Sequence, residues 1–476
     1  MYQVFPDRFA PPDAPPPPAP PRRARPWSKT PRKGRYLPSA GVWSHELHVW
    51  GGTLTGVRAH LDHVAALADV LYLNPIHDAL TNHRYDARDW TRVDPLLGTR
   101  DDVVALAEDL HRRGLRLMLD GVFNHLGRTA PAFQRALTHP DAPERAWFDL
   151  DARYTHGARS WFDVFNLPEV RLEHPAVRKL AFEGPDSVVQ RWLREGADGW
   201  RLDVAHDLGP ALCAAIRQGA RAAKPDAWVV GEVWNDPRGW LDTLDGVLNM
   251  HLRVLLLELV DGTLAPARFG RLLERHLADA GIEGLLRSWL VLDNHDTPRL
   301  ASRLPKPWQR RLAQTLQLAL PGSPVLYYGV EIGMTGDGDP TNRAPMRWDE
   351  VPGHPELERL RTLLDLRRRL PALRFGDATV LDGEGLVAFT RHTDRVEETV
   401  LVLVNPGPEP VTERLALRDP RLMSGSPLED ALHPGETVHV DAGTVRVSVP
   451  ARGARLLTPR MPPAWGYDPY RRLLQD

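Results

Sequence analysis

The sequence predicts an α/β protein in which a (β/α)8 TIM barrel is followed by an all-β sandwich domain. Eight short, mostly apolar segments alternate with helical sequence between residues 2 and 373, which is the pattern of a closed parallel barrel. A doubly wound sheet is the alternative, but no glycine-rich phosphate loop follows the first strand. After about Arg374 the pattern changes to short β-type runs between turn residues, which is typical of a sandwich.

The eight predicted strands are separated by segments with helical periodicity. The strands lie at residues 2–6, 70–75, 115–122, within 198–207, and at 228–234, 246–250, 288–293 and 323–328. Apolar residues recur at helical spacing in the segments 54–68, 103–111 and 188–194, each of which precedes a predicted strand. Strand and helix therefore alternate as a barrel requires.

Two segments interrupt this alternation. Residues 11–26 are largely proline, and we expect a stiff surface loop there, because the tract lies inside a domain. Residues 126–178 are rich in His, Pro, Asp and aromatic residues and are expected to form an inserted subdomain after the third strand. The predicted division is a barrel at 1–125 and 179–373, the insertion at 126–178, the sandwich at 374–460 and a tail at 461–476.

Composition and charge are those of an ordinary soluble globular protein. The chain has 476 residues, of which 42% are hydrophobic and 26% charged, and its net charge is -2. Nucleic acid is not expected as a partner, because phosphate backbones require a clustered basic surface. No apolar run approaches the length of a membrane span, and no signal peptide follows Met1, so we expect a cytoplasmic location.

The single cysteine, Cys213, rules out an internal disulfide framework. It lies in an Ala-rich helical run, where a buried and inert thiol is the simpler interpretation than a nucleophile.

Polar residues cluster at the ends of the predicted strands. In a parallel barrel the catalytic groups come from the C-terminal ends of the strands. The residues found there are Asp120 with Asn124 and His125, Arg201 with Asp203, Glu232, and Asn294 with His295 and Asp296. Taken singly, each set has a structural explanation, such as a helix cap or an ion pair within a strand. Four sets in barrel order favour one shared cleft.

These segments resemble the signature regions of the α-amylase family of retaining glycoside hydrolases and transglycosidases. The resemblance lies in residues 120–125, 199–203, 231–234 and 293–296. Within that family, residues 2–9, 82–86 and 336–343 look like the neopullulanase, cyclomaltodextrinase and maltogenic amylase group. Because the first strand begins at Tyr2, we expect the N-terminal domain of that group to be absent.

The resemblance implies that Asp203 is the nucleophile, Glu232 the general acid and base, and Asp296 a stabiliser of the transition state. Arg201 lies two residues before Asp203 on the same strand face, where its charge would keep a nucleophilic carboxylate ionised. Glu232 precedes Val233 and Trp234, an apolar setting that would favour a protonated acid. Neighbouring barrel strands can supply the separation of about 5 Å that a retaining pair needs.

The resemblance also implies a set of substrate-binding residues. His125 and His295 would hydrogen-bond the sugar at the cleaved bond together with Arg201, and Tyr85 would stack on its ring. A Tyr after a strand is otherwise a core residue. Asp339 and Arg343 resemble residues that hold the next sugar outward, and the alternative for them is an ion pair within a loop.

Three further features bear on metals and on the leaving group. His45 and His48 flank Glu46, but this spacing lacks the helix-face pairing of a zinc hydrolase, so we expect a surface loop. Calcium needs six to eight oxygen ligands, and the first loop offers Asp13 among prolines and little else. We therefore predict no cofactor and no metal, with calcium left open. His206 would face the leaving-group side.

The predicted function is a retaining α-glucan hydrolase acting on α-1,4 bonds of maltooligosaccharides, pullulan or cyclodextrins. Cleavage of α-1,6 bonds and transglycosylation remain open, as does the oligomeric state. An exo-acting α-glucosidase is the second interpretation. A non-catalytic carbohydrate-binding protein is the third, and the presence of Asp203, Glu232 and Asp296 together argues against it.

Overall fold

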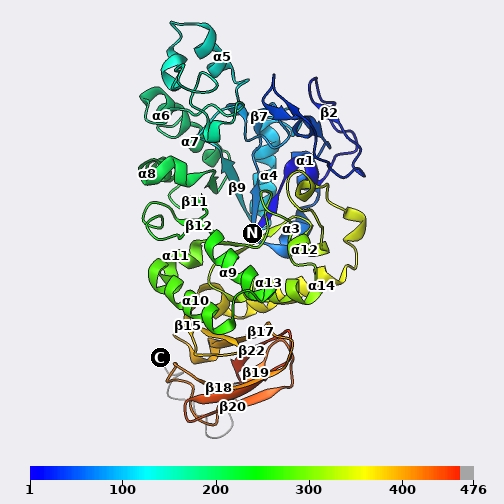
Figure 1. Ribbon diagram of the computed structural model, residues 1–476, viewed down its shortest axis with the longest axis vertical. Coiled ribbons are helices and arrows are strands. Elements are labelled where there is room, and N and C mark those ends of the chain that lie inside the picture. The colour runs from blue at the N-terminus through cyan, green and yellow to red at the C-terminus, as the bar shows by residue number, and fades with distance from the viewer. Residues whose placement is uncertain (461–476) are drawn as a thin grey trace.

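Eight parallel strands close into a barrel in the computed structural model, which describes residues 1–460 (Figure 1). All eight predicted strands form. They are β1 (Tyr2–Val4), β6 (Val70–Leu73), β9 (Arg116–Gly121), β10 (Gly199–Leu202), β11 (Trp228–Val233), β12 (Gly246–Asn249), β13 (Trp289–Val291) and β14 (Ser323–Tyr327). β1 pairs with both β6 and β14, which closes the ring. The predicted tail, 461–476, lies outside the described residues.

Side-chain alternation along the strands divides the barrel core from the core outside it. Val70 and Tyr72 of β6 belong to the cluster inside the barrel, whereas Leu71 and Leu73 pack with the surrounding helices. The interior cluster continues with Met118, Val230, Leu248, Met250, Trp289, Val291 and Val325. Because strand side chains alternate with a period of two, the residue two positions after an interior one also points inward. Asp120 follows Met118 and Glu232 follows Val230 by this rule.

The helices surround the barrel and follow the strands in the expected order. They are α1 (Pro6–Phe9), α2 (Leu54–Ala59), α3 (Leu61–Leu67), α4 (Arg100–Arg112), α7 (Val188–Arg194), α8 (Ala205–Ala223), α9 (Met250–Asp261), α10 (Pro266–Ala280), α11 (Ile282–Arg287), α12 (Leu300–Arg303), α13 (Pro307–Ala319), α14 (Pro355–Arg369) and α15 (Pro371–Phe375). The helix predicted over 54–68 is broken at His60. Within residues 1–460, no helix is both long and apolar enough to cross a membrane.

Long connections rise from the C-terminal ends of β1, β6 and β9. The first contains β2 (Arg23–Ala24), β3 (Tyr36–Leu37), β4 (Val42–Trp43), the 3-10 turn η1 (Ser44–Leu47) and β5 (His48–Val49). The second is the hairpin of β7 (His77–Ala79) and β8 (Ala87–Val93). The third contains α5 (Pro131–Thr138), η2 (Pro143–Trp147), η3 (Trp161–Asp163) and α6 (Pro175–Ala181). In Figure 1 the α5 and α6 segment extends from one end of the molecule.

The C-terminal part is an antiparallel sheet in the order β15-β16-β17-β22-β19-β20-β21-β18. Its strands are β15 (Asp377–Val380), β16 (Val387–His392), β17 (Val400–Asn405), β18 (Val411–Ala416), β19 (Pro427–Asp430), β20 (Thr437–Asp441), β21 (Thr444–Val449) and β22 (Gly453–Pro459). Inner residues of both halves, such as Leu403 and Val447, share a second core, as a sandwich requires. Outer residues such as Phe389 and Val402 continue the core of the barrel helices.

Two buried arginines bind the end of α13. Arg367 of α14 donates to the carbonyls of Leu318 and Gly322 at 2.5 and 2.7 Å. Arg391 of β16 donates to the carbonyl of Ala319 at 2.7 Å and to that of Gly376 at 2.8 Å. The last carbonyls of a helix have no partner within the helix, so both side chains act as a C-terminal cap.

Cys213 is expected to resist alkylation in the folded protein. It is fully buried in α8, where its thiol donates to the carbonyl of Ala205 at 3.5 Å, and burial raises its pKa to about 12. At pH 8 almost no thiolate is present to react. Mass spectrometry after iodoacetamide treatment should show no adduct on the native chain and one adduct in denaturant. An adduct formed equally fast on the native chain would contradict this assignment.

Candidate active site

The guanidinium of Arg201 brings three carboxylates together at the C-terminal end of the barrel. In the register of the sheet, Arg201 on β10 lies beside Asp120 on β9. Its Nη1 contacts Asp120 Oδ1 at 2.8 Å and Asp203 Oδ1 at 2.7 Å, and its Nη2 contacts Glu232 Oε2 at 2.8 Å. The predicted pairing of Arg201 with Asp203 is therefore present. Both carboxylates of the predicted catalytic pair contact one fixed cation.

Glu232 lies in a polar setting, and the apolar setting predicted from Val233 and Trp234 is wrong. In addition to Arg201, the backbone N–H of Val204 donates to Glu232 Oε2 at 3.1 Å. The indole Nε1 of Trp234 donates to Oε1 at 3.1 Å. The prediction failed because the side chain of Val233 points away from the site, while the indole Nε1 of Trp234 faces Glu232. These contacts fix the orientation of the carboxyl group.

Burial raises the pKa of Asp203, the charge of Arg201 lowers it, and the negative charges of Glu232 and Asp120 raise it further, so that the net direction is upward. Burial also raises the pKa of Asp120 against the lowering effect of Arg201. Arg201 therefore acts on Asp203 in the expected direction, while burial and the neighbouring carboxylates act against it. One guanidinium does not offset the burial of Asp203 together with its two carboxylate neighbours, so the ionised form of Asp203 is less favoured than that of a free carboxyl.

A hydrogen-bond chain holds Tyr85 at the cavity wall. The amide of Gln3 donates to His295 Nδ1 at 3.0 Å, and His295 Nε2 contacts the hydroxyl of Tyr85 at 2.5 Å. That hydroxyl donates to Asp120 Oδ2 at 2.9 Å. Tyr85 is half-buried and lines the cavity, so it is not a pure core residue.

His295 and Arg201 are buried next to residues that line the cavity, since His295 contacts Tyr85 and Arg201 contacts Asp203 and Glu232. Both are buried, at 1% and 0% exposure, and neither is among the described residues that line the cavity. Burial, with the charges of Arg343 and Arg201, lowers the pKa of His295 well below its usual value, which keeps the imidazole neutral. Direct contact of these two residues with a sugar stays a prediction.

His125 lines the cavity beside Tyr85. Its Nε2 donates to the carbonyl of Tyr85 at 3.1 Å, and burial lowers its pKa to about 4. A neutral imidazole at this position offers a hydrogen bond to a neutral sugar hydroxyl without the cost of a buried charge.

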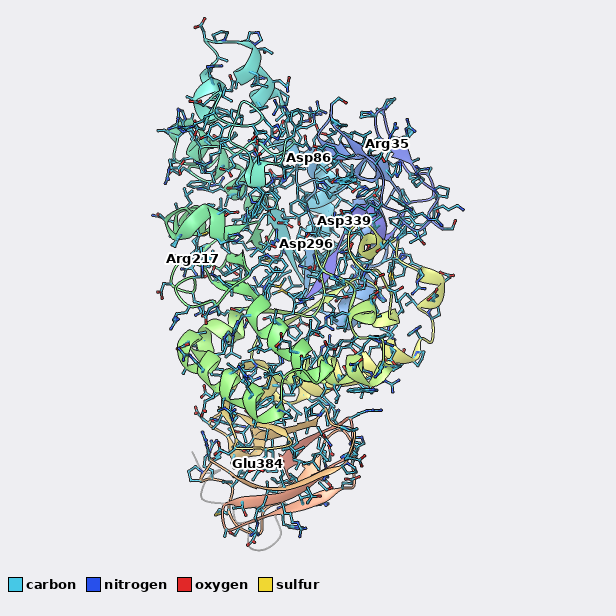
Figure 2. All side chains as sticks on the ribbon, in the orientation of Figure 1. Arg35, Asp86, Arg217, Asp296, Asp339 and Glu384 are labelled. Carbon is cyan, nitrogen blue, oxygen red and sulfur yellow. The ribbon has the colours of Figure 1, made fainter. Side chains whose placement is uncertain are left out.

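Asp296, Arg343 and Asp339 form a charged row on one side of the cavity. Arg343 Nη2 contacts Asp296 Oδ1 at 3.3 Å, and its Nη1 contacts Asp339 Oδ1 at 3.1 Å. Burial acts to raise the pKa of Asp339, but the charge of Arg343 outweighs it and holds the pKa below its usual range. The loop ion pair considered from sequence exists, and both its members also line the cavity. Figure 2 labels Asp296 and Asp339 near each other, far from Glu384 in the C-terminal sheet.

His45 was predicted on a surface loop, and this is wrong, because it is 4% exposed and its Nε2 lies 3.6 Å from Asp339 Oδ2. Its Nδ1 accepts from the backbone N–H of Gly34 at 3.0 Å. His48 is half-buried and contacts Arg25. The two histidines therefore have separate partners.

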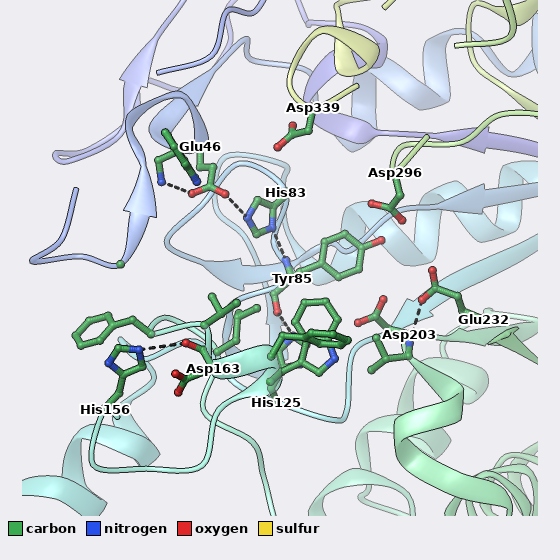
Figure 3. A pocket seen from close by; sticks show the side chains of 18 of the residues that line it. Glu46, His83, Tyr85, His125, His156, Asp163, Asp203, Glu232, Asp296 and Asp339 are labelled. Atoms are coloured by element: carbon green, nitrogen blue, oxygen red, sulfur yellow. Dashed lines mark hydrogen bonds and ion pairs between the residues drawn. The ribbon is translucent and has the colours of Figure 1, made fainter. Parts of the chain in front are cut away.

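The cavity has a volume of about 920 Å³, and its walls come from the barrel and from all three long connections (Figure 3). Asp203, Glu232 and Asp296 lie around the same end of it. Sequence reasoning did not select the lining residues Trp43, Glu46, His83, Trp161, Phe162 and Trp234. His206, considered only as a neighbour of the leaving group, also lines it. Trp234, next to Glu232, and His83, within the segment 82–86, carried a usable sequence signal, whereas the other positions depend on how loops fold over the barrel.

The site and fold were then compared with those of known proteins. Residues 3–359 match the model of the alpha amylase catalytic domain. The chain belongs to the α-amylase family. A cyclomaltodextrinase of a Bacillus species is 33% identical over 423 residues, which cover 85% of this chain and 72% of the relative. Neopullulanase 2 of Thermoactinomyces vulgaris is 32% identical over 468 residues, covering 94% of this chain and 75% of the relative.

Solved structures of α-amylase family members share the whole architecture. The cyclic α-maltosyl-(1→6)-maltose hydrolase of Arthrobacter globiformis superposes with a TM-score of 0.80 at 31% identity, covering 96% of this chain and 98% of that one. A cyclomaltodextrinase structure gives a TM-score of 0.82 at 29% identity, covering 96% and 77%. The predicted barrel and C-terminal β domain are confirmed, and the chain is a glycoside hydrolase of this family.

Proposed function

We propose that this chain is a retaining α-glucan hydrolase that cleaves α-1,4 glucosidic bonds of maltooligosaccharides and of cyclic or branched α-glucans. The observation that carries the proposal is that Asp203 and Glu232 line an aromatic-walled cavity and contact one buried guanidinium. Two carboxyls held by adjacent nitrogens of Arg201 suit the separation of about 5 Å that a retaining pair requires. Names of the relatives, cyclomaltodextrinase and neopullulanase among them, agree with this substrate class.

In the first step, Asp203 attacks the anomeric carbon while Glu232, in its protonated form, gives its proton to the leaving glycosidic oxygen. The carbon–oxygen bond breaks as a covalent ester forms with Asp203. In the second step, Glu232 takes a proton from water, whose oxygen displaces Asp203 and restores both groups. Transfer to a sugar hydroxyl in place of water gives transglycosylation by the same step.

The remaining residues bind and orient the sugar. Asp296 would accept hydrogen bonds from hydroxyls as positive charge develops on the ring, held in place by Arg343 at 3.3 Å. Tyr85 and His125 would contact the ring at the cleaved bond, while Asp339 and Arg343 would hold the next sugar outward. Arg201 positions Asp203 and Glu232 through its two nitrogens, and His295 positions Tyr85. We also propose a cytoplasmic location, since one relative from Bacillus subtilis is named an intracellular maltogenic amylase.

Product analysis on linear and cyclic substrates tests the proposal. A cyclic oligosaccharide has no chain end, so an exo-acting glucosidase cannot begin on it. We expect hydrolysis of β-cyclodextrin and of cyclic α-maltosyl-(1→6)-maltose, and release of products from maltotriose and pullulan as α-anomers in the first NMR spectra. Glucose as sole product, with both cyclic substrates intact, would establish the exo-acting alternative. A β-anomer formed first would exclude a retaining mechanism.

A further inference from the structure

Away from the cavity, three potential metal ligands converge where the loop after β11 meets two helices. Asp236 follows β11, His251 is the second residue of α9, and His276 lies in α10. One ligand atom from each lies within 4.8 Å of the other two, and no other such group of three is present in residues 1–460. The helices α9 and α10 lie beside each other in Figure 1 and contact each other.

His276 carries the observation that points to a ligand. Its side chain is 2% exposed, and its Nδ1 is buried without a hydrogen-bond partner among the described residues. A buried polar atom without a partner costs free energy, and native structures seldom leave one. Asp236 and His251 are half-buried, which leaves a route for an ion from solvent.

We propose that Asp236, His251 and His276 bind a zinc-class divalent ion, with water as the fourth ligand. Two imidazole nitrogens and one carboxylate oxygen suit zinc, whereas calcium takes six to eight oxygen ligands. With bonds of about 2.0–2.2 Å, ligand atoms around a tetrahedral zinc lie about 3.4 Å apart. The cluster must therefore contract by roughly 1 Å, which rotation of the two half-buried side chains can supply.

Zinc binding also determines the orientation of the side-chain amide of Asn249, the residue before α9. Its amide donates to His276 Nε2 at 2.9 Å, and its Oδ1 accepts from the backbone N–H of Leu252 at 3.0 Å. A metal on Nδ1 requires the proton on Nε2, so the amide must turn its oxygen toward His276. Ligating histidines commonly donate their second N–H to such an acceptor. The turn gives up the side-chain cap of α9, which the bound ion offsets.

A metal ion at this site would link the loop after β11 to the helices α9 and α10. The loop begins with Trp234, whose indole contacts Glu232, and it is already held by Arg238 at 3.6 Å from Asp279 of α10. A bound ion adds a stronger link from Asp236 to α9 and α10. The ion is therefore structural, and no step of the hydrolysis depends on it.

Zinc binding by the full chain, freed of any affinity tag, tests the proposal. After equilibrium dialysis against zinc chloride, elemental analysis is expected to find a single zinc ion per chain, and the melting temperature is expected to rise. The variants His251→Ala and Asp236→Asn change half-buried positions and keep the fold. Each is expected to weaken zinc binding by at least about tenfold and to lose the rise in melting temperature. His439→Ala, an exposed histidine of β20, is the matched control and is expected to behave as the wild type.

Calcium chloride in the same experiment is expected to give neither binding at this site nor a change in melting temperature that depends on His251. The proposal is overturned if the wild type binds no zinc. It is equally overturned if His251→Ala and Asp236→Asn bind zinc as tightly as His439→Ala does. These results are independent of hydrolysis, so failure here leaves the proposed function untouched.

Discussion

Replacement of Asp203 with Asn is expected to lower kcat/KM on maltotriose by at least about 10⁴-fold. An amide cannot form the ester that replaces the broken glycosidic bond, so the covalent route is lost. The fold should remain, because Arg201 keeps its contacts with Asp120 at 2.8 Å and with Glu232 at 2.8 Å. Initial rates measured by reducing-sugar release, with circular dichroism and melting temperature as checks on folding, decide the result.

Asp226→Asn provides the matched control for this variant. The side chain of Asp226 is 61% exposed and precedes β11, at the end of the barrel away from the cavity. The same change of carboxylate to amide there is expected to leave kcat/KM unaltered. If Asp203→Asn retained activity within about tenfold of the wild type while Asp226→Asn did so too, Asp203 would not be the nucleophile.

Replacement of Glu232 with Gln is expected to lower the hydrolysis of maltotriose by about 10²–10⁴-fold, the range of general acid–base catalysis. The loss should depend on the leaving group. Fluoride leaves without a proton, so α-maltosyl fluoride is expected to give a rapid burst of one fluoride per enzyme. Slow turnover follows, because water attack on the ester still lacks its base. Stopped-flow detection of fluoride measures both phases.

The burst and its absence distinguish two roles for Glu232. A residue that only held Arg201 in place would, when changed to Gln, slow maltotriose and α-maltosyl fluoride by the same factor. Equal losses with no burst would therefore contradict the assignment of Glu232 as acid and base.

The barrel could be predicted from sequence because its signals are local. Strand-length apolar runs alternate with helical periodicity, and the inward position of Asp120 and Glu232 follows from their spacing to Met118 and Val230. The pairing of Arg201 with Asp203 follows from the same rule. These parts of the site depend on backbone geometry that every barrel shares.

The surroundings of Glu232 and the cavity walls could not be predicted in the same way. The contact of Glu232 with Arg201 and the Val204 amide joins residues of different strands, and their sequence neighbours suggested an apolar site. Trp43 and Trp161 reach the cavity only because long connections fold over the barrel. Contacts of this kind depend on the tertiary arrangement and leave no periodic pattern in the sequence.

The proposed metal ligands illustrate the same limit. Asp236, His251 and His276 are separated in the chain by many residues and match no metal-binding spacing. The adjacent histidines His45 and His48 drew attention by their proximity, yet they have separate partners. Proximity in sequence was the wrong guide, because a helix pair brings distant residues together.

The cap that Arg367 and Arg391 place on α13 has a consequence for how the molecule is divided. The composition changes near residue 374, but Arg391 donates from the sheet to the carbonyl of Ala319 in the barrel layer. Phe389 and Val402 of the sheet also belong to the core of the barrel helices. Removal of the sheet would leave helix carbonyls without donors and an apolar face in water. The change of pattern therefore marks a change of architecture but not an independent folding unit, because the sheet caps and covers helices on one side of the barrel.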